Sequence, residues 1–196
     1  MKTPCPGRSI ERWPYSALQT AGSISAPVAA SPTLPHRRRS RAASSSSPAG
    51  LPPLRLVDPD VIAALYRASQ AGVEIDLIVR GICCLLPGLG GVSERIRVVS
   101  IIGRFLEHSR IAYFANGGNP EYYIGSADWM PRNFDRRVEA MAPIDDVAWH
   151  GRLQRVLETC LADNRQAWEL GADGTYRRRV AEGAEERATH ATMMRD

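Results

Sequence analysis

Residues 58–79 read DPDVIAALYRASQAGVEIDLIV, and this stretch decides the fold class. Asp58 is a favourable helix cap, and Pro59 suits the first helical position because its missing N–H would have no partner there. The apolar residues that follow share one helical face up to Gly72: Val61, Ile62, Leu65 and Ala68. The pattern predicts an amphipathic helix that Gly72 terminates.

Residues 73–79, which follow this glycine, are mainly β-branched or aliphatic and predict a largely buried strand. Turn residues at 116–120 predict a hairpin between two later strands. The other expected elements are a Gly- and Pro-rich loop at 81–93, strands at 96–102, 109–115, 121–125 and 137–143, and an amphipathic helix within 146–164. We therefore expect an α/β domain with a mixed β-sheet flanked by helices.

The chain of 196 residues has room for one such domain, expected at 54–196, and an N-terminal tail. Residues 1–53 mix Pro, Ser and Ala with arginines and show no lasting hydrophobic period, so we expect them to be disordered. Their composition resembles an organellar transit peptide, although we favour an upstream extension from a misplaced start codon or a frameshift.

Charge is divided unevenly between the tail and the rest of the chain. Residues 1–50 hold seven basic residues against one acidic residue, whereas the remainder holds 18 against 20. Net charge therefore gives no support for nucleic-acid binding by the predicted domain. No apolar run approaches the roughly 20 residues that a membrane-spanning helix needs, so no membrane span is expected.

His108 and Arg110 lie between two of the predicted strands. An imidazole can move a proton near neutral pH or accept a phosphoryl group, and a guanidinium can bind two phosphate oxygens at once. A His-x-Arg tripeptide alone is weak evidence, because a single histidine is more often structural.

A second polar cluster follows the predicted strand at 121–125 and reads GSADWMPRN over residues 125–133. Its Ser126 and Asn133 can orient an imidazole or bind an oxyanion. Together with the upstream His108 and Arg110, the cluster resembles one half of a phospholipase-D-type site, where His-x-Lys is followed by Gly-Ser-x-x-Asn.

The chain departs from the phospholipase D pattern at several points. Arg110 stands where those enzymes have lysine, and Ala115 stands where an aspartate is expected. Such a phosphodiesterase also needs two half-sites, and this sequence shows one. Hydrolysis of a lipid or nucleic-acid phosphodiester is therefore the weaker hypothesis.

Arg80 ends the predicted strand at 73–79 and opens the Gly-rich loop. This position delivers its charge to the rim of the sheet, where α/β proteins usually bind ligands. A surface salt bridge with Asp76 or Glu74 is the structural alternative, and composition alone slightly favours it.

Blocks of the chain, in order and with their spacing kept, resemble the C-terminal part of the long-chain bacterial polyphosphate kinases. The blocks are 56–59, 65–73, 76–85, 103–110, 126–133 with 135–139, and 163–164 through 173–176. The resemblance runs from about Leu56 to about Arg179 and implies a phospholipase-D-like fold.

The resemblance also implies roles for individual residues. His108 matches the histidine of the second of two facing phospholipase-D-like domains, which contacts ATP and assists proton transfer. Arg80 matches the arginine that binds the nucleotide phosphates. Motif positions around the phosphate tunnel match Arg110, Ser126, Asp128, Arg132 and Asn133. The histidine that becomes phosphorylated belongs to the first domain, which has no counterpart in this chain.

The implied function is a part in the reversible transfer of the terminal phosphate of ATP to inorganic polyphosphate, for which this chain alone is expected to be incomplete. Mg²⁺ is expected with ATP, but its ligands cannot be named, because Asp76, Asp128 and Glu139 are equally explained as salt-bridge partners of nearby arginines. Expected partners are ATP or ADP, inorganic polyphosphate, and the missing kinase domains or another subunit, in a parent enzyme that is a homo-oligomer. The expected location is the cytoplasm, with peripheral attachment of the parent complex to the membrane or organellar import as further options.

Two other classes of function remain open. The chain could be a remnant or split subunit that only binds nucleotide or polyphosphate, through Arg80, Arg110 and Arg132. It could also be a phospholipase-D-like phosphodiesterase whose single half-site, with His108, is doubled in a symmetric dimer.

Overall fold

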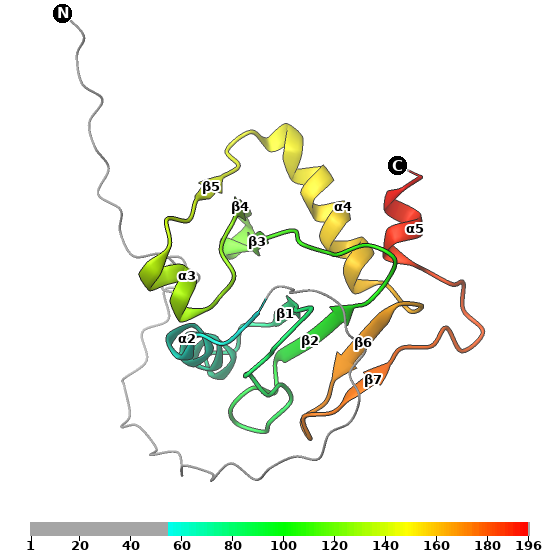
Figure 1. Ribbon diagram of the computed structural model, residues 1–196, viewed down its shortest axis with the longest axis horizontal. Coiled ribbons are helices and arrows are strands. Elements are labelled where there is room, and N and C mark those ends of the chain that lie inside the picture. Colours follow the sequence, from blue (N-terminus) through cyan, green and yellow to red (C-terminus); the bar gives the residue numbers. More distant parts are fainter. Residues whose placement is uncertain (1–54, 196) are drawn as a thin grey trace, which may run out of the picture.

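The computed structural model describes residues 55–195, so the expected disordered tail at 1–53 lies outside the described residues. The described part contains two separate β-sheets with helices packed around them (Figure 1). The expected α/β class, with mixed strand directions and flanking helices, is confirmed. None of the helices within 55–195 is long and apolar enough to cross a membrane.

The first described helix, α2 (Pro59–Gln70), forms as the sequence predicts. One carboxylate oxygen of Asp58 accepts hydrogen bonds from the backbone N–H groups of Asp60, at 3.1 Å, and Val61, at 3.0 Å. Gly72 follows the helix with a φ of +92°, a conformation that glycine adopts without strain. The side chains that α2 buries are those of Val61, Ala64, Leu65 and Ser69.

The larger sheet has the strand order β1-β2-β6-β7. Its strands are β1 (Ile75–Ile78), β2 (Ile96–Ile101), β6 (Ala167–Leu170) and β7 (Tyr176–Arg178). β1 and β2 are parallel, and the two other pairings are antiparallel. β1 is shorter than the expected strand at 73–79 and less buried, because it is an edge strand whose Asp76 faces solvent.

The core below this sheet joins α2 to both parallel strands. It contains the buried side chains of Leu56, Val61, Leu65, Leu77, Val79, Leu85, Ile96, Val98 and Leu170. A smaller apolar cluster, formed by Val99, Ile101, Cys160 and Ala167, lies on the opposite face. Since successive side chains of a strand point to opposite faces, β2 contributes to both clusters and is the central strand of the domain.

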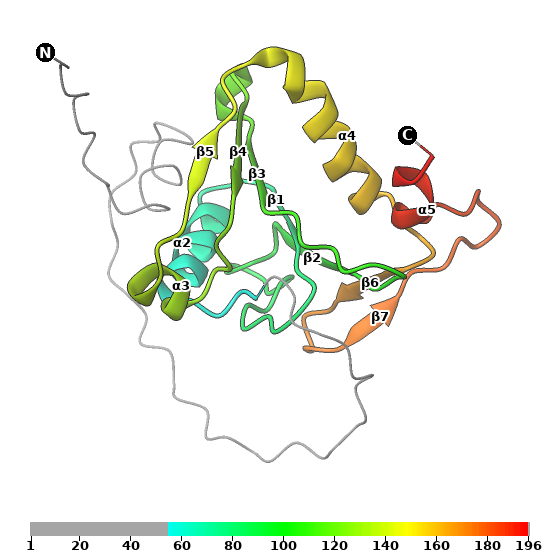
Figure 2. The same cartoon turned by 45° about the horizontal axis from the view of Figure 1, so that its top comes forward.

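The hairpin forms a sheet of its own, which corrects the expectation of a single mixed sheet. β3 (Ile111–Phe114), β4 (Glu121–Gly125) and β5 (Met141–Pro143) pair in antiparallel order. Figure 2 shows these strands apart from the larger sheet. The separation has a local cause, because residues 102–110 form neither helix nor strand and lead the chain away from β2 before β3 begins.

The helix expected within 146–164 is α4 (His150–Leu161), preceded by a 3₁₀ turn at Val147–Trp149. It packs Cys160 into the smaller apolar cluster, where Met193 of α5 (Thr189–Met193) also lies. The helix ends before Asp163, whose side chain instead accepts hydrogen bonds from the backbone that follows. The strands β6 and β7 and the short helix α5 complete the domain.

Candidate functional site

The segment at 102–110 carries His108 and is fixed at its start by α5. The backbone N–H of Phe105 donates to Nδ1 of His190 at 3.4 Å, and the two rings meet edge to face with centroids 5.6 Å apart. A Cβ atom on Gly103 would collide with the side chains of Gln166 and His190. The backbone therefore passes through a space that only glycine fits.

Substituting Gly103→Ala is expected to lower the free energy of unfolding by about 1–3 kcal/mol, because the added methyl must displace the buried His190 ring or the segment itself. Urea denaturation of the two proteins measures the difference. Gly151→Ala is the matched control. An added Cβ on Gly151 of α4 would meet only Nη1 of Arg155, at an ordinary contact distance of 3.8 Å, so this variant should gain about 0.4–1 kcal/mol. Equal stability of the Gly103 variant and the wild type would contradict this packing.

His108 itself is exposed, and within residues 55–195 its imidazole makes no hydrogen bond or ion pair. Its backbone carbonyl oxygen accepts a hydrogen bond from the guanidinium of Arg110. The backbone of His108 is thus held while its ring is left available for a ligand.

Arg110 and Asp128 form an ion pair between the start of the hairpin and the segment after β4. Their side chains are only 6% and 12% exposed, so water screens this pair little. The hairpin register brings the two side chains together, because the backbone N–H of Gly125, three residues before Asp128, donates to the carbonyl oxygen of Arg110 at 2.9 Å. Part of the Arg110 guanidinium is therefore engaged by protein groups, and its Nε is buried without a partner among the described residues.

Ser126 and Asn133 both bind Glu139, for which the sequence suggested only a metal ligand or a salt-bridge partner of an arginine. The two oxygens of its carboxylate accept from the Ser126 hydroxyl at 2.5 Å and from Nδ2 of Asn133 at 2.7 Å. The hydroxyl oxygen of Ser126 also accepts from the backbone N–H of Ala140 at 3.0 Å. The arrangement joins the end of β4 to α3 (Pro131–Arg136) and to the strand that follows it.

The hydrogen bond from Ser126 is the main cause that lowers the pKa of Glu139 below its usual value. Partial burial opposes this effect, whereas the bond from Asn133 and the nearby charges of Arg137 and Arg110 reinforce it. Glu139 is therefore ionised at neutral pH and fixes two of the expected site residues by charge-assisted hydrogen bonds.

Arg80 follows β1 at the edge where both parallel strands have their carboxyl ends. The salt bridge considered from the sequence is wrong, because Asp76 pairs with Arg97 at 2.7 Å and Glu74 pairs with Arg95. Nη1 of Arg80 is buried and has no hydrogen-bond partner within residues 55–195. A buried N–H donor without an acceptor is unfavourable, and an anionic ligand would supply one.

The remaining expected residue, Arg132, lies in the first turn of α3 and is exposed. Its side chain contacts no carboxylate in the described part of the chain. The geometry thus links Arg110 to Asp128 and to the His108 backbone, and Ser126 and Asn133 to Glu139. Arg80 belongs to the other sheet and bonds to neither group.

No three His, Cys, Asp or Glu side chains within 55–195 lie close enough together to hold a metal ion. The carboxylates that were considered for Mg²⁺ are otherwise engaged. Asp76 and Asp128 are salt-bridge partners of arginines, which was one of the two explanations considered from the sequence. Glu139 instead accepts hydrogen bonds from a hydroxyl and an amide. The described residues do not fit a magnesium site of their own.

Comparison with known proteins places this geometry in a family. The chain is 67% identical over 140 residues to a polyphosphate kinase of Thermosynechococcus vestitus, a match that covers 71% of this chain and 19% of that protein. A polyphosphate kinase of Pseudomonas aeruginosa is 58% identical over 140 residues, again 71% of this chain and 20% of that protein. The chain therefore spans about a fifth of the length of these curated relatives.

A solved structure agrees with the sequence matches. The crystal structure of polyphosphate kinase from Porphyromonas gingivalis superposes with a TM-score of 0.70 at 42% sequence identity, covering 72% of this chain and 22% of that one. This match confirms the fold that the sequence resemblance implied. The family model of the polyphosphate kinase C-terminal domain 2 matches residues 54–190. The chain therefore belongs to the polyphosphate kinase family and contains its C-terminal domain 2.

Proposed function

We propose that this chain forms the nucleotide-side half of a polyphosphate kinase active site, which transfers the terminal phosphate of ATP to inorganic polyphosphate and back. The phosphorylated histidine of the reaction would lie outside this chain. The proposal rests on family membership together with one geometric observation, the buried and unpartnered guanidinium nitrogen of Arg80.

Arg80 is suited to bind phosphate oxygens. Its neighbours Glu74 and Asp76 are both paired with other arginines, so its charge is available to an anion. A guanidinium directs several N–H donors at a phosphate, and neutralising charge on the transferred group is the main requirement of phosphoryl transfer. In this proposal Arg80 holds the nucleotide phosphates at the rim of the larger sheet.

His108 acts on the same nucleotide. Its exposed imidazole manages the proton at the leaving oxygen, while Arg110, held by Asp128, fixes the His108 backbone and adds positive charge beside it. Ser126 and Asn133, oriented by Glu139, form part of the wall of the phosphate tunnel. Arg132 extends its positive charge into solvent.

The proposed partners follow from the same chemistry. They are ATP or ADP, inorganic polyphosphate, and the further polyphosphate kinase domains, supplied by a longer chain or by another subunit of a homo-oligomer. Mg²⁺ would enter with the nucleotide, and since the described residues offer it no site, we assign no step to it. The proposed location is the cytoplasm.

Calorimetric titration with a non-hydrolysable ATP analogue tests the proposal. Arg80→Gln is expected to raise Kd by about tenfold or more, because a charge-assisted hydrogen bond is worth about 1.5–3 kcal/mol. His108→Ala should weaken binding by about fivefold, as expected for one neutral hydrogen bond. Arg97→Gln is the matched control, since this arginine of β2 is already paired with Asp76 of β1, and the substitution should leave Kd unchanged.

An Arg80 variant that binds the analogue as tightly as the wild type would refute the nucleotide role. Incubating the chain with ATP, or with polyphosphate and ADP, should give no sustained turnover until the missing domains are added. Binding without any turnover, even with those domains present, would instead favour a remnant that only binds nucleotide or polyphosphate.

A further inference from the structure

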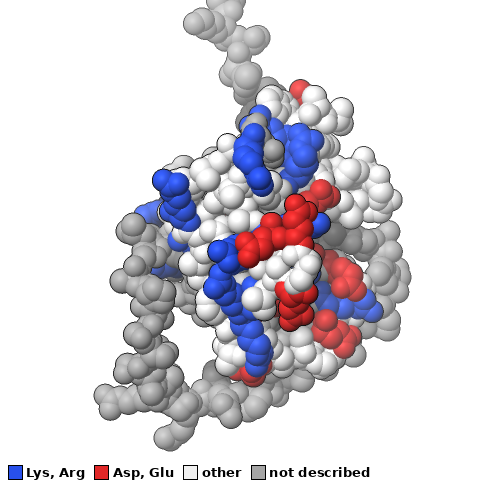
Figure 3. Space-filling view, turned by 90° about the vertical axis from the view of Figure 1, so that its right-hand side faces the viewer, with Lys and Arg blue, Asp and Glu red and all other residues white. Residues whose placement is uncertain are grey.

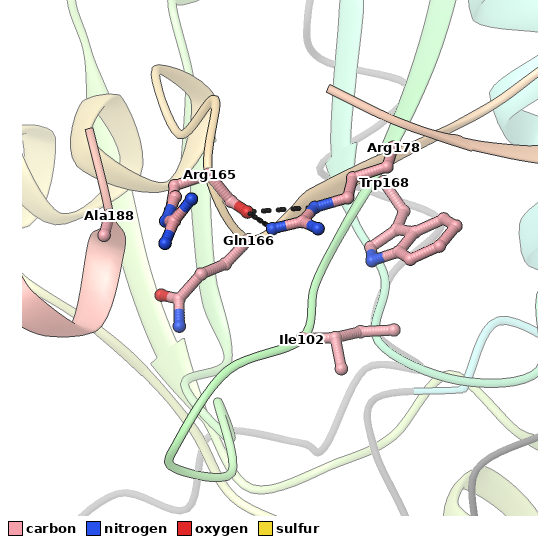
Figure 4. A pocket seen from close by; sticks show the side chains of 6 residues that line it. All are labelled: Ile102, Arg165, Gln166, Trp168, Arg178 and Ala188. Carbon is pink, nitrogen blue, oxygen red and sulfur yellow. Dashed lines mark hydrogen bonds between the residues drawn. The ribbon is translucent and has the colours of Figure 1, made fainter. Parts of the chain in front are cut away.

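A second candidate ligand site lies at the carboxyl end of β2, apart from the residues of the proposed catalytic site. A cavity of about 460 Å³ opens there, which is within the usual size range of small-molecule sites. Its walls are formed by Ile102, Arg165, Gln166, Trp168, Arg178 and Ala188 (Figure 4). None of these residues belongs to the proposed catalytic site.

The pleat of the sheet explains why these side chains gather. Trp168 of β6 and Arg178 of β7 are directly paired in register, so they stand side by side on one face. Leu170, two residues after Trp168, points to the same face and is buried in the core with α2. The cavity therefore continues the face of the larger sheet beyond its apolar core, with a flat indole and a guanidinium in its wall.

Charge in the cavity is positive. Arg177 and Arg179 are both paired with carboxylates, those of Asp173 and Glu169. Arg178, between them, instead donates through Nε at 3.2 Å and Nη2 at 2.7 Å to the backbone carbonyl oxygen of Arg165 (Figure 4). No acidic residue lines the cavity. Figure 3 shows that both basic and acidic side chains are exposed on this side of the molecule.

This hydrogen bond to Arg165 also orients Arg178. A guanidinium fixed at one edge keeps its remaining N–H groups directed away from that carbonyl, and it loses little conformational freedom when an anion binds. Arg165 is less available, because it pairs with Glu186 at 3.2 Å on the exposed surface.

Gln166, one of the residues that line the cavity, also carries an acceptor without a partner among the described residues. Oε1 of Gln166 is buried and has no hydrogen-bond partner within residues 55–195. A ligand that satisfies all three features carries an anionic group for Arg178, a flat ring for Trp168 and an N–H donor for Gln166. A nucleoside monophosphate has these groups in one small molecule, since the exocyclic amine of adenine is such a donor.

We propose that the cavity between β2, β6 and β7 is a second nucleotide site, which binds a nucleoside monophosphate through Arg178, Trp168 and Gln166. The inference goes beyond the proposed function, because it concerns a separate set of residues. It stands whether or not Arg80 and His108 bind ATP.

NMR of the indole N–H signals, recorded on the full chain during titration with AMP, tests the proposal. The signal of Trp168, identified by its absence in Trp168→Phe, should shift in a saturable manner. Arg178→Gln should weaken this binding by about tenfold or more, as the loss of a charged partner predicts. Arg80→Gln should leave it unchanged, which separates this site from the proposed catalytic one.

A second variant tests the site independently in case Arg178→Gln fails to fold. Ile102→Glu places a negative charge at the cavity from a side chain that is 47% exposed, and it should also weaken binding by about tenfold. Val180→Glu, at an exposed residue outside the cavity wall, is its matched control and should bind as the wild type does. Adenosine and inorganic phosphate alone should each bind at least about tenfold more weakly than AMP.

The proposal is overturned if the Trp168 signal does not respond to AMP, or if AMP binds Ile102→Glu as tightly as the wild type. Equal affinity for phosphate alone would show a simple anion site and would equally overturn the nucleotide assignment.

Discussion

Replacing Asp128 by alanine is expected to lower the free energy of unfolding by about 3–5 kcal/mol. The substitution leaves the guanidinium of Arg110 charged and without its carboxylate partner at a position that is only 6% exposed. An unpaired buried charge is far less favourable than a hydrated one, and arginine cannot lose its proton to escape the penalty. Urea denaturation followed by circular dichroism measures the change.

Two further variants distinguish the effect of burying the ion pair from the effect of forming an ion pair at all. Glu74→Ala breaks the exposed pair with Arg95 and should change stability by less than about 1 kcal/mol. A double variant, Arg110→Met with Asp128→Leu, should recover most of the loss, because apolar side chains of similar size can replace a buried ion pair. A small effect of Asp128→Ala would mean that the pair is hydrated in solution.

Asp163→Ala is expected to cost about 3 kcal/mol or more, since each buried donor left without an acceptor costs about 1–3 kcal/mol. The fully buried carboxylate accepts backbone N–H groups through both oxygens. These bonds come from Arg165, Gln166, Ala167 and Thr189, at 2.9, 2.6, 3.0 and 2.7 Å. Asp163→Asn should cost less than alanine does, because the amide keeps one acceptor oxygen and loses chiefly the bond from Thr189.

The effect of Asp163 should depend on pH. Burial alone would raise its pKa, but the N–H bonds from Thr189, Gln166 and Arg165 outweigh burial and lower the pKa below its usual value. A group with a lowered folded-state pKa stabilises the fold fully above its unfolded pKa of about 3.9, and this stability is lost as the pH falls through the folded value. The difference in free energy of unfolding between the wild type and Asp163→Ala, measured by urea denaturation, should therefore become smaller at acidic pH. A difference that stays constant as the pH is lowered would contradict an ionised Asp163.

Local signals allowed part of this fold to be predicted from the sequence. The α2 helix has its cap, first-turn proline and terminal glycine within a single stretch, and the β3–β4 hairpin has its turn residues between its strands. Strand partners depend on distant residues, which is why the division of the strands into two sheets was not predicted. The short helix α5 has too few residues to show a hydrophobic period.

The candidate site shows the same division between local and distant information. His108, Arg110 and Ser126 could be identified because they belong to compact motifs. The availability of Arg80 could not, since it depends on the register that sets Asp76 against Arg97 across β1 and β2. Glu139 was missed as an orienting residue because no short motif ties it to Ser126 and Asn133; only the fold brings them together.

The hydrogen bonds made by α5 have a consequence for shortened versions of this domain. Thr189 is bound by Asp163, and the next residue, His190, holds Phe105 in the segment that leads to His108. A protein that terminates before Thr189 would keep every residue of the proposed catalytic site and both sheets. It would nevertheless lose the support of the histidine segment, so the C-terminal boundary chosen for expression decides whether that segment is still held in place.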